Sequence, residues 1–168
     1  MKKLLVNGEE FEAEQIVQNH DSIVGYNGQT EVFAFRGISD FSQFKLHDEL
    51  DNDITIDFHK ERKINALNNG YKTDLTSGFT SNGIRFKYAE IDQLNFTKRT
   101  NAIALGISEQ VFYFGTADGV IKFTIDEFKQ AAKDAEIHEM TVYGKLDSLR
   151  NQVYSATTTE EVEAVTWQ

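Results

Sequence analysis

The longest regular pattern of hydrophobic positions lies near the C-terminus, between residues 124 and 156. Apolar residues recur there at alternating intervals of three and four, the heptad repeat of a helix whose seam must be covered. The seam positions are Ile125, Phe128, Ala132, Ala135, Glu139, Val142, Leu146, Leu149, Val153 and Ala156. The repeat predicts one long helix of the coiled-coil type, with an interface seam formed by Glu139, Val142, Leu146, Leu149 and Val153.

Helix-start signals flank this region. Thr124 with Glu127 fits a capping box, and Thr158 with Glu161 fits a second one that predicts a short terminal helix. Gly144 inside the long helix costs about 1 kcal/mol, so two helices hinged there are the alternative to a continuous helix. A continuous helix would be about 48 Å long, which exceeds the needs of so small a domain. The surplus suggests contact with other helices of the chain or with copies of the same helix.

Residues 1–50 have the pattern of a small antiparallel β module. Alternating apolar and polar residues flank Asn7-Gly8, a favoured hairpin turn, and a second hairpin is expected over residues 22–35. We expect four or five strands, onto which Phe41, Phe44 and Leu46 pack. The acidic stretch 47–53 predicts a linker ending in a helix N-cap, and a calcium loop beginning at Asp51 is the less favoured alternative.

A helix followed by a hairpin is predicted twice between this linker and the long helix. The first unit is a helix over 57–75 and a hairpin around Asn82-Gly83. The second is a helix over 89–105, with Ile91, Leu94, Ala102 and Leu105 on one stripe, and a hairpin over 110–123. The predicted fold class is α+β: a β module (1–50), then a helix–hairpin–helix–hairpin–long helix domain (51–168).

Composition narrows the classes of function. The chain has 168 residues, 40% hydrophobic, with no cysteine and a net charge of −10. A globular domain stabilised by packing is expected, and the acidity argues against nucleic-acid binding. No apolar run approaches the roughly 20 residues of a membrane helix. Residues 1–6 start like a secretion signal, but their apolar stretch ends after three residues, so no signal peptide is expected.

No residue pattern assigns catalysis, a cofactor or a metal. The four histidines lack the spacing of a metal pair, and neither a nucleophile elbow nor a phosphate-binding glycine loop is present. We therefore expect a protein that is not an enzyme. Phe112 with Phe114, and Phe33 with Phe35, could stack on a sugar ring, but alternate aromatic residues in a strand more often belong to a core.

Residues 56–167 resemble a small domain of unknown function found in tail-region proteins of tailed bacteriophages. The resemblance lies in the order of several short motifs, which are Arg62-Lys63-Ile64-Asn65-Ala66, Gly78-Phe79, Asn82-Gly83-Ile84, Asp92-Gln93-Leu94-Asn95-Phe96, Ala117-Asp118-Gly119, Phe123-Thr124-x-x-Glu127-Phe128, Lys145-Leu146-x-x-Leu149-Arg150-x-Gln152-Val153-x-x-Ala156-Thr157 and Trp167. In such domains a tryptophan often precedes the motif that corresponds to Ala117-Asp118-Gly119, and this sequence has no tryptophan there. Residues 1–50 lie outside the resemblance.

The resemblance implies a setting in a phage or prophage, near the adsorption apparatus. The leading hypothesis is a structural or adaptor protein of a tail tip or baseplate, made in the host cytoplasm and carried in the virion. Its partners would be other tail proteins, with a homo-oligomer as a further option, and neither nucleic acid nor membrane. One alternative is an assembly factor for the tail fibre or receptor-binding protein. Another is an acidic host-directed inhibitor that mimics DNA.

Overall fold

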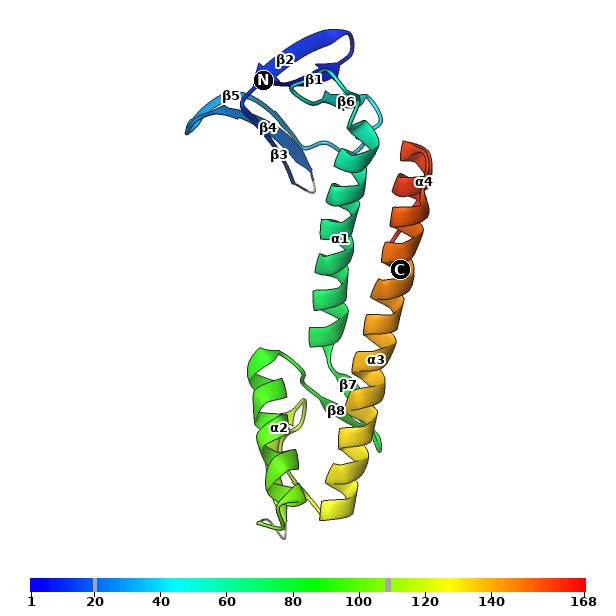
Figure 1. The fold of residues 1–168 in the computed structure, drawn as a ribbon. Coiled ribbons are helices and arrows are strands. Elements are labelled where there is room, and N and C mark those ends of the chain that lie inside the picture. Colours follow the sequence, from blue (N-terminus) through cyan, green and yellow to red (C-terminus); the bar gives the residue numbers. More distant parts are fainter. Residues whose placement is uncertain (20, 108–109) are drawn as a thin grey trace. The chain divides into compact units, whose positions relative to one another are not determined.

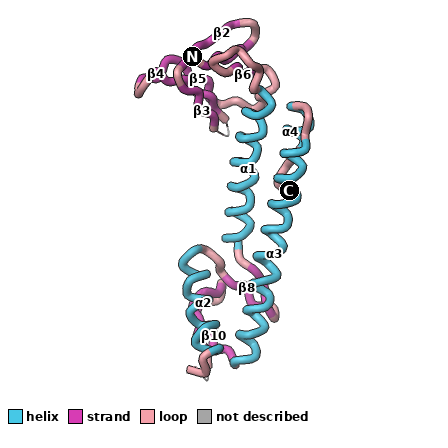
Figure 2. Tube along the Cα trace, viewed as in Figure 1, coloured by secondary structure: helices cyan, strands magenta, loops and turns pink. Residues whose placement is uncertain are grey.

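The computed structural model describes residues 1–19, 21–107 and 110–168. It is a mixed α+β structure in which antiparallel strands come first and helices follow, as the sequence predicts (Figures 1 and 2). Its elements are β1 (Lys2–Val6), β2 (Glu9–Ala13), β3 (Gln15–Gln18), β4 (Ser22–Asn27), β5 (Thr30–Arg36), β6 (Phe44–His47), α1 (Thr55–Ser77), β7 (Phe79–Ser81), β8 (Ile84–Phe86), α2 (Glu90–Ala104), β9 (Val111–Thr116), β10 (Gly119–Phe123), α3 (Ile125–Ser155) and α4 (Thr159–Ala164).

Backbone contacts group the chain into two compact units. Unit 1 consists of Met1–Asn68 and Ser148–Gln168, and unit 2 consists of Asn69–Asp147. Both α1 and α3 therefore contribute one part to each unit. The expected division into residues 1–50 and 51–168 stays a prediction.

The six described strands of unit 1, where four or five were expected, form two three-stranded sheets, ordered β2-β1-β6 and β3-β4-β5. The hairpin between β1 and β2 turns at Asn7 and Gly8, which both have positive φ. Such turns favour Asn-Gly because glycine has no Cβ to clash in the left-handed region. The sequence interpretation missed β3 and β6, which pair with β4 and β1 over only four residues each.

The core of unit 1 joins both sheets to the start of α1. Phe41, Phe44 and Leu46 are buried in it, as expected, and the other buried members are Leu4, Val6, Ile23 and Phe58. The predicted linker ends at α1, where the Asp53 carboxylate accepts a hydrogen bond of 2.9 Å from the Thr55 N–H. This bond satisfies one of the N–H groups that a helix start leaves unpaired.

Polar contacts join the helices of unit 1 to one another, and Figure 1 shows the first part of α1 beside the end of α3. Lys60 Nζ donates to the Tyr154 carbonyl over 3.0 Å, and an Arg150 N–H donates to the Asn68 side-chain oxygen over 2.6 Å. The expected terminal helix, α4, folds back and buries Val162 and Val165.

Unit 2 is built around aromatic side chains. Its sheet has the order β10-β9-β8-β7, and one face of the sheet packs on α2 and the first part of α3. Phe128 of α3 lies at the centre, with ring centroids 4.8 Å from Phe96, 5.5 Å from Tyr113 and 5.8 Å from Phe123. Rings at such distances gain offset or edge-to-face attraction in addition to the burial of apolar area.

The long helix α3 is continuous from Ile125 to Ser155, so the prediction of one unbroken helix is confirmed. A Cβ added at Gly144 would meet no other atom within 4 Å, which places this glycine on an open side of the helix. The glycine weakens the helix without breaking it, because the apolar seam on the other side is buried at Val142 and Leu146.

Substitution of Phe128 by alanine tests this account of the core of unit 2. The side chain is fully buried, so the loss of apolar burial and the resulting cavity should cost about 3–5 kcal/mol in free energy of unfolding. Lys129→Ala, one residue along on the exposed side, should change it by less than about 0.5 kcal/mol. Urea denaturation followed by circular dichroism measures both. Equal stability of the two variants would show that Phe128 is not a core residue.

Candidate binding groove between α2 and β9

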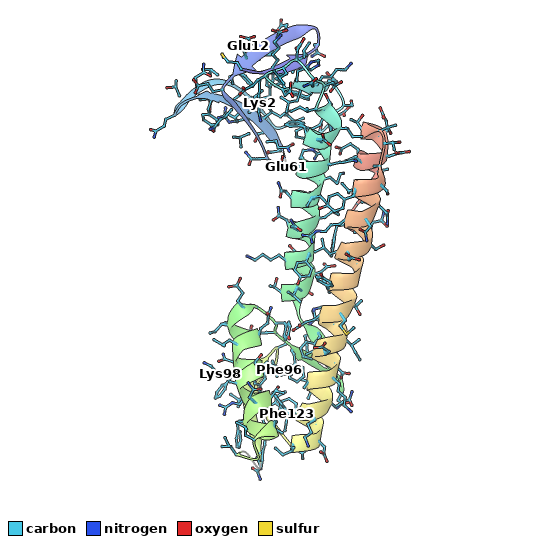
Figure 3. The ribbon with its side chains drawn as sticks, viewed as in Figure 1. Lys2, Glu12, Glu61, Phe96, Lys98 and Phe123 are labelled. Atoms are coloured by element: carbon cyan, nitrogen blue, oxygen red, sulfur yellow. The ribbon has the colours of Figure 1, made fainter. Side chains whose placement is uncertain are left out.

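The apolar stripe of α2 faces the solvent. Of the predicted stripe, Ile91, Leu94 and Leu105 are exposed and Ala102 is partly buried. Phe96, on another side of the helix, is only 5% exposed and belongs to the core. Figure 3 shows Phe96 on the side of α2 toward α3, and Lys98 on the far side. An apolar stripe ordinarily marks the buried face of a helix. Here Phe96 and the partly buried Ile103 set the buried face, and the stripe is left without a partner among the described residues.

The strand β9 presents two aromatic rings outward in the same way. Its residues alternate, with Val111 and Tyr113 buried and Phe112 and Phe114 at 53% and 67% exposure. The expectation that Phe112 and Phe114 belong to a core is wrong, whereas Phe33 and Phe35 do pack against the core of unit 1. Alternation along the strand cannot show which set of residues faces the core.

A groove of about 410 Å³ separates α2 from β9. It is lined by Asp92, Asn95, Lys98 and Arg99 from the helix and by Phe112, Tyr113, Phe114 and Gly115 from the strand. Its volume lies in the range of about 300–1,000 Å³ that is usual for ligand pockets.

Tyr113 fixes the spacing of the two walls. Its hydroxyl donates a hydrogen bond of 3.1 Å to the Asp92 carbonyl, and burial, followed by the nearby Asp92 charge, raises the pKa of Tyr113 to about 12. A Cβ at Gly115 would lie 2.6 Å from the Tyr113 ring, so only glycine leaves room for this ring. The phenol therefore stays protonated and keeps donating throughout the physiological pH range.

The helix wall of the groove is cationic in an otherwise acidic protein. Neither Lys98 nor Arg99 has an ion-pair partner among the described side chains, and Asp92 is the acidic residue of the lining. Lys122 of β10 lies outside the lining, but its Nζ is 5.9 Å from the centre of the Phe112 ring. The groove thus combines exposed aromatic surface with a net positive charge.

This combination is suited to binding. Aromatic rings supply apolar contact area, and unpaired cations attract carboxylates. No group of three or more histidine and carboxylate side chains in the described residues could hold a metal ion. None of the described helices is long and apolar enough to cross a membrane.

The sequence-predicted capping residues lie at helix starts. The Glu127 N–H donates to Thr124 Oγ1 over 3.2 Å, and the Thr124 N–H donates to the Glu127 carboxylate over 2.8 Å. Thr158 and Glu161 make the same pair of bonds at the start of α4. Hydrogen bonds from the Thr124 N–H and hydroxyl lower the pKa of Glu127, because they favour the charged carboxylate. The pKa of Glu161 is lowered in the same way, first by bonds from the Thr157 N–H and hydroxyl and then by the bond from the Thr158 N–H.

The predicted seam residues are turned toward the interior of the chain. Val142, Leu146 and Val153 are buried, and Leu149 and Glu139 are partly buried. Glu139 accepts a hydrogen bond from the Tyr88 hydroxyl, and burial, followed by this bond, raises the pKa of Tyr88. The polar residue of the seam therefore has a partner within unit 2. An interface role of this seam toward another subunit stays a prediction.

A cluster of polar residues that sequence reasoning missed joins α1 to α4 in unit 1. The Glu163 carboxylate accepts from Arg62 and lies 3.0 Å from His59 Nδ1 and 3.1 Å from Lys63 Nζ. His59, Arg62 and Lys63 are all buried. Burial by itself would raise the pKa of Glu163, but the hydrogen bonds from His59, Arg62 and Lys63, together with the charge of Arg62, hold it well below its usual value.

Comparison with known proteins gives one match. Residues 58–166, which are more than half of the chain, match a family model described as a domain of unknown function (DUF4376). No curated protein and no solved structure matches the chain. The matched range includes the whole groove and leaves out all six described β-strands of unit 1.

Replacement of Glu163 by glutamine tests the polar cluster of unit 1. At pH 7 the free energy of unfolding of the variant should be about 2–4 kcal/mol lower than that of the wild type, since Arg62 and Lys63 stay buried without a counter-charge. A carboxylate whose pKa is depressed by folding stabilises the folded protein at pH values above its unfolded pKa. The wild type should therefore lose this contribution progressively as the pH falls below 4.5. Urea denaturation at pH 7 and at about pH 3 should show a smaller acid effect in the variant. Glu9→Gln, an exposed change, is the control, and equal losses in both variants would refute the cluster's role.

Replacement of Phe112 and Phe114 by serine tests whether these rings belong to a core. Because both rings are exposed, the double variant should lose no more than about 1 kcal/mol in free energy of unfolding. Thermal and urea denaturation of the double variant beside Phe128→Ala gives the comparison. A loss as large as that of Phe128→Ala would place the two rings in the core and remove the groove as a binding site.

Proposed function

We propose that this chain, which belongs to the DUF4376 family, is a non-enzymatic structural or adaptor protein of a bacteriophage tail tip or baseplate. In this role it is carried in the virion and contacts other tail proteins or receptor-binding proteins. The phage setting rests on the order of motifs between Arg62 and Trp167 that resembles domains of tail-region proteins. The adaptor role rests on the surface of unit 2.

The observation that carries the adaptor role is the concentration of exposed hydrophobic side chains in unit 2. Soluble proteins expose single hydrophobic residues often, but an ordered stripe of them marks an interaction surface. The large exposed hydrophobic residues of unit 2 are Ile91, Leu94, Leu105, Ile107, Phe112, Phe114, Val120, Ile137, Met140 and Tyr143. Their exposure is explained if another protein covers them.

The two predicted domains would have different tasks. The β module of residues 1–50 would dock on one partner, and the helix–hairpin–helix–hairpin–long helix domain of residues 51–168 would hold another. Since the seam of α3 is buried within the chain, a second subunit would meet the outer side of this helix, where Ile137, Met140 and Tyr143 are exposed. These three residues recur at intervals of three, which places them on neighbouring positions of one helix face.

Mass spectrometry of purified phage particles tests the proposal. A tail component should be found in washed, nuclease-treated virions at a constant ratio to other tail proteins. Presence during assembly but absence from mature particles would contradict a structural role and favour the assembly-factor alternative. Absence from both, with capture of a host nucleic-acid enzyme by the purified chain, would favour the inhibitor.

A further inference from the structure

We propose that the groove between α2 and β9 binds an extended, acidic peptide segment of a partner protein, which adds as a strand to the open edge of β9. This inference rests on the proposed adaptor function and names the kind of partner that the adaptor holds. It is carried by the open strand edge, the aromatic wall and the cationic wall of the same groove.

The open edge of β9 supplies the backbone pairing. β10 pairs along most of the strand, but β8 meets β9 at a single residue pair, Phe86 with Thr116. Lys87 N–H donates to the Gly115 carbonyl over 2.7 Å, and the chain then leaves the strand to form α2. Toward Val111 this edge of β9 has no strand partner in the described part of the chain. An extended peptide can pair there by main-chain hydrogen bonds, as in strand addition to a sheet edge.

The aromatic wall fits the side chains of such a strand. Phe112 and Phe114 lie two residues apart on the same face of β9, so their spacing equals the two-residue repeat of an added strand. Every second side chain of the peptide would contact one of the rings, as cross-strand neighbours do. Apolar residues at alternate peptide positions therefore match this wall.

The cationic wall selects the charge of the peptide. Lys98 and Arg99 line the groove opposite the strand, without an ion-pair partner among the described residues, and Asp92 offsets one of the two charges. Carboxylates at the remaining peptide positions would gain from this charge, whereas a basic peptide would be repelled. The occupant is therefore an alternating acidic and apolar strand.

An anionic oligosaccharide is the competing occupant, because sugar rings also stack on phenylalanine and carboxylates also meet Lys98 and Arg99. The two occupants differ in one respect. A peptide strand needs its backbone N–H groups to pair with β9, whereas an oligosaccharide has none and would make no use of the open edge. Removal of peptide N–H groups therefore separates strand addition from recognition by side chains alone.

The test selects ligands from a ribosome-displayed library of random decapeptides on the purified full chain. Peptides that alternate acidic and apolar residues should be enriched, and their affinity is then measured by fluorescence anisotropy. The double variant Lys98→Glu with Arg99→Glu should weaken binding at least about tenfold. Methylation of alternate backbone nitrogens of the peptide should weaken it by a similar factor, about tenfold, because each lost hydrogen bond leaves a partner unpaired.

The matched control is Lys129→Glu with Lys133→Glu, two exposed lysines of α3 in the same unit, which should leave the affinity unchanged. Circular dichroism melts check that every variant is folded. The inference is overturned if no such peptides are enriched, or if the Lys98 and Arg99 variant binds them as tightly as the wild type does. It is also overturned if the methylated peptides bind as tightly as the unmethylated ones, or if a galacturonate hexamer displaces the labelled peptide at a lower concentration than the unlabelled peptide does. Failure here, with the protein present in virions, would leave the tail function standing.

Discussion

The packing of Phe96 against Phe128 is the contact on which the exposed surface of unit 2 depends. With ring centroids 4.8 Å apart in the centre of unit 2, it fixes the rotation of α2 about its own axis. Once Phe96 points inward, Ile91, Leu94 and Leu105 must point away from the core, because they lie on another side of the same helix. In β9, Tyr113 points into the core. Because successive side chains of a strand point to opposite faces, Phe112 and Phe114 then point outward. The groove is thus a consequence of how the core is filled.

Local signals in the sequence were sufficient for most elements. Asn7-Gly8 and Asn82-Gly83 mark hairpins, and Thr124 and Thr158 mark helix starts, because each signal acts through residues close in sequence. The short strands β3 and β6 were missed because four residues carry too little periodicity. The sequence showed the apolar stripe on α2 but did not show that the stripe is exposed. Periodicity indicates that a helix has two faces, and it does not indicate which of them packs against Phe128. The groove could not be found from the sequence for the same reason.

The polar cluster of unit 1 illustrates a second limit. Glu163 meets His59, Arg62 and Lys63 across about a hundred residues of chain, and no spacing rule connects them. The cluster ties the last helix to α1 by charge, in addition to the hydrophobic core that unit 1, like unit 2, builds around aromatic rings. The phage setting remains the proposal that the motif order supports.

Hydroxyl-radical footprinting of the isolated chain, read by mass spectrometry, tests the central claim most directly, namely that the α2 stripe and the β9 rings face solvent. The account predicts fast oxidation of Leu94, Phe112 and Phe114, and strong protection of Phe96 and Phe128, in the same sample. Oxidation of Phe96 as fast as that of Leu94, or protection of Phe112 and Phe114 in the isolated monomer, would contradict it. The first outcome would show that Phe96 does not set the buried face of α2. The second would show that the chain itself covers the two rings, so that no partner would be needed to explain them.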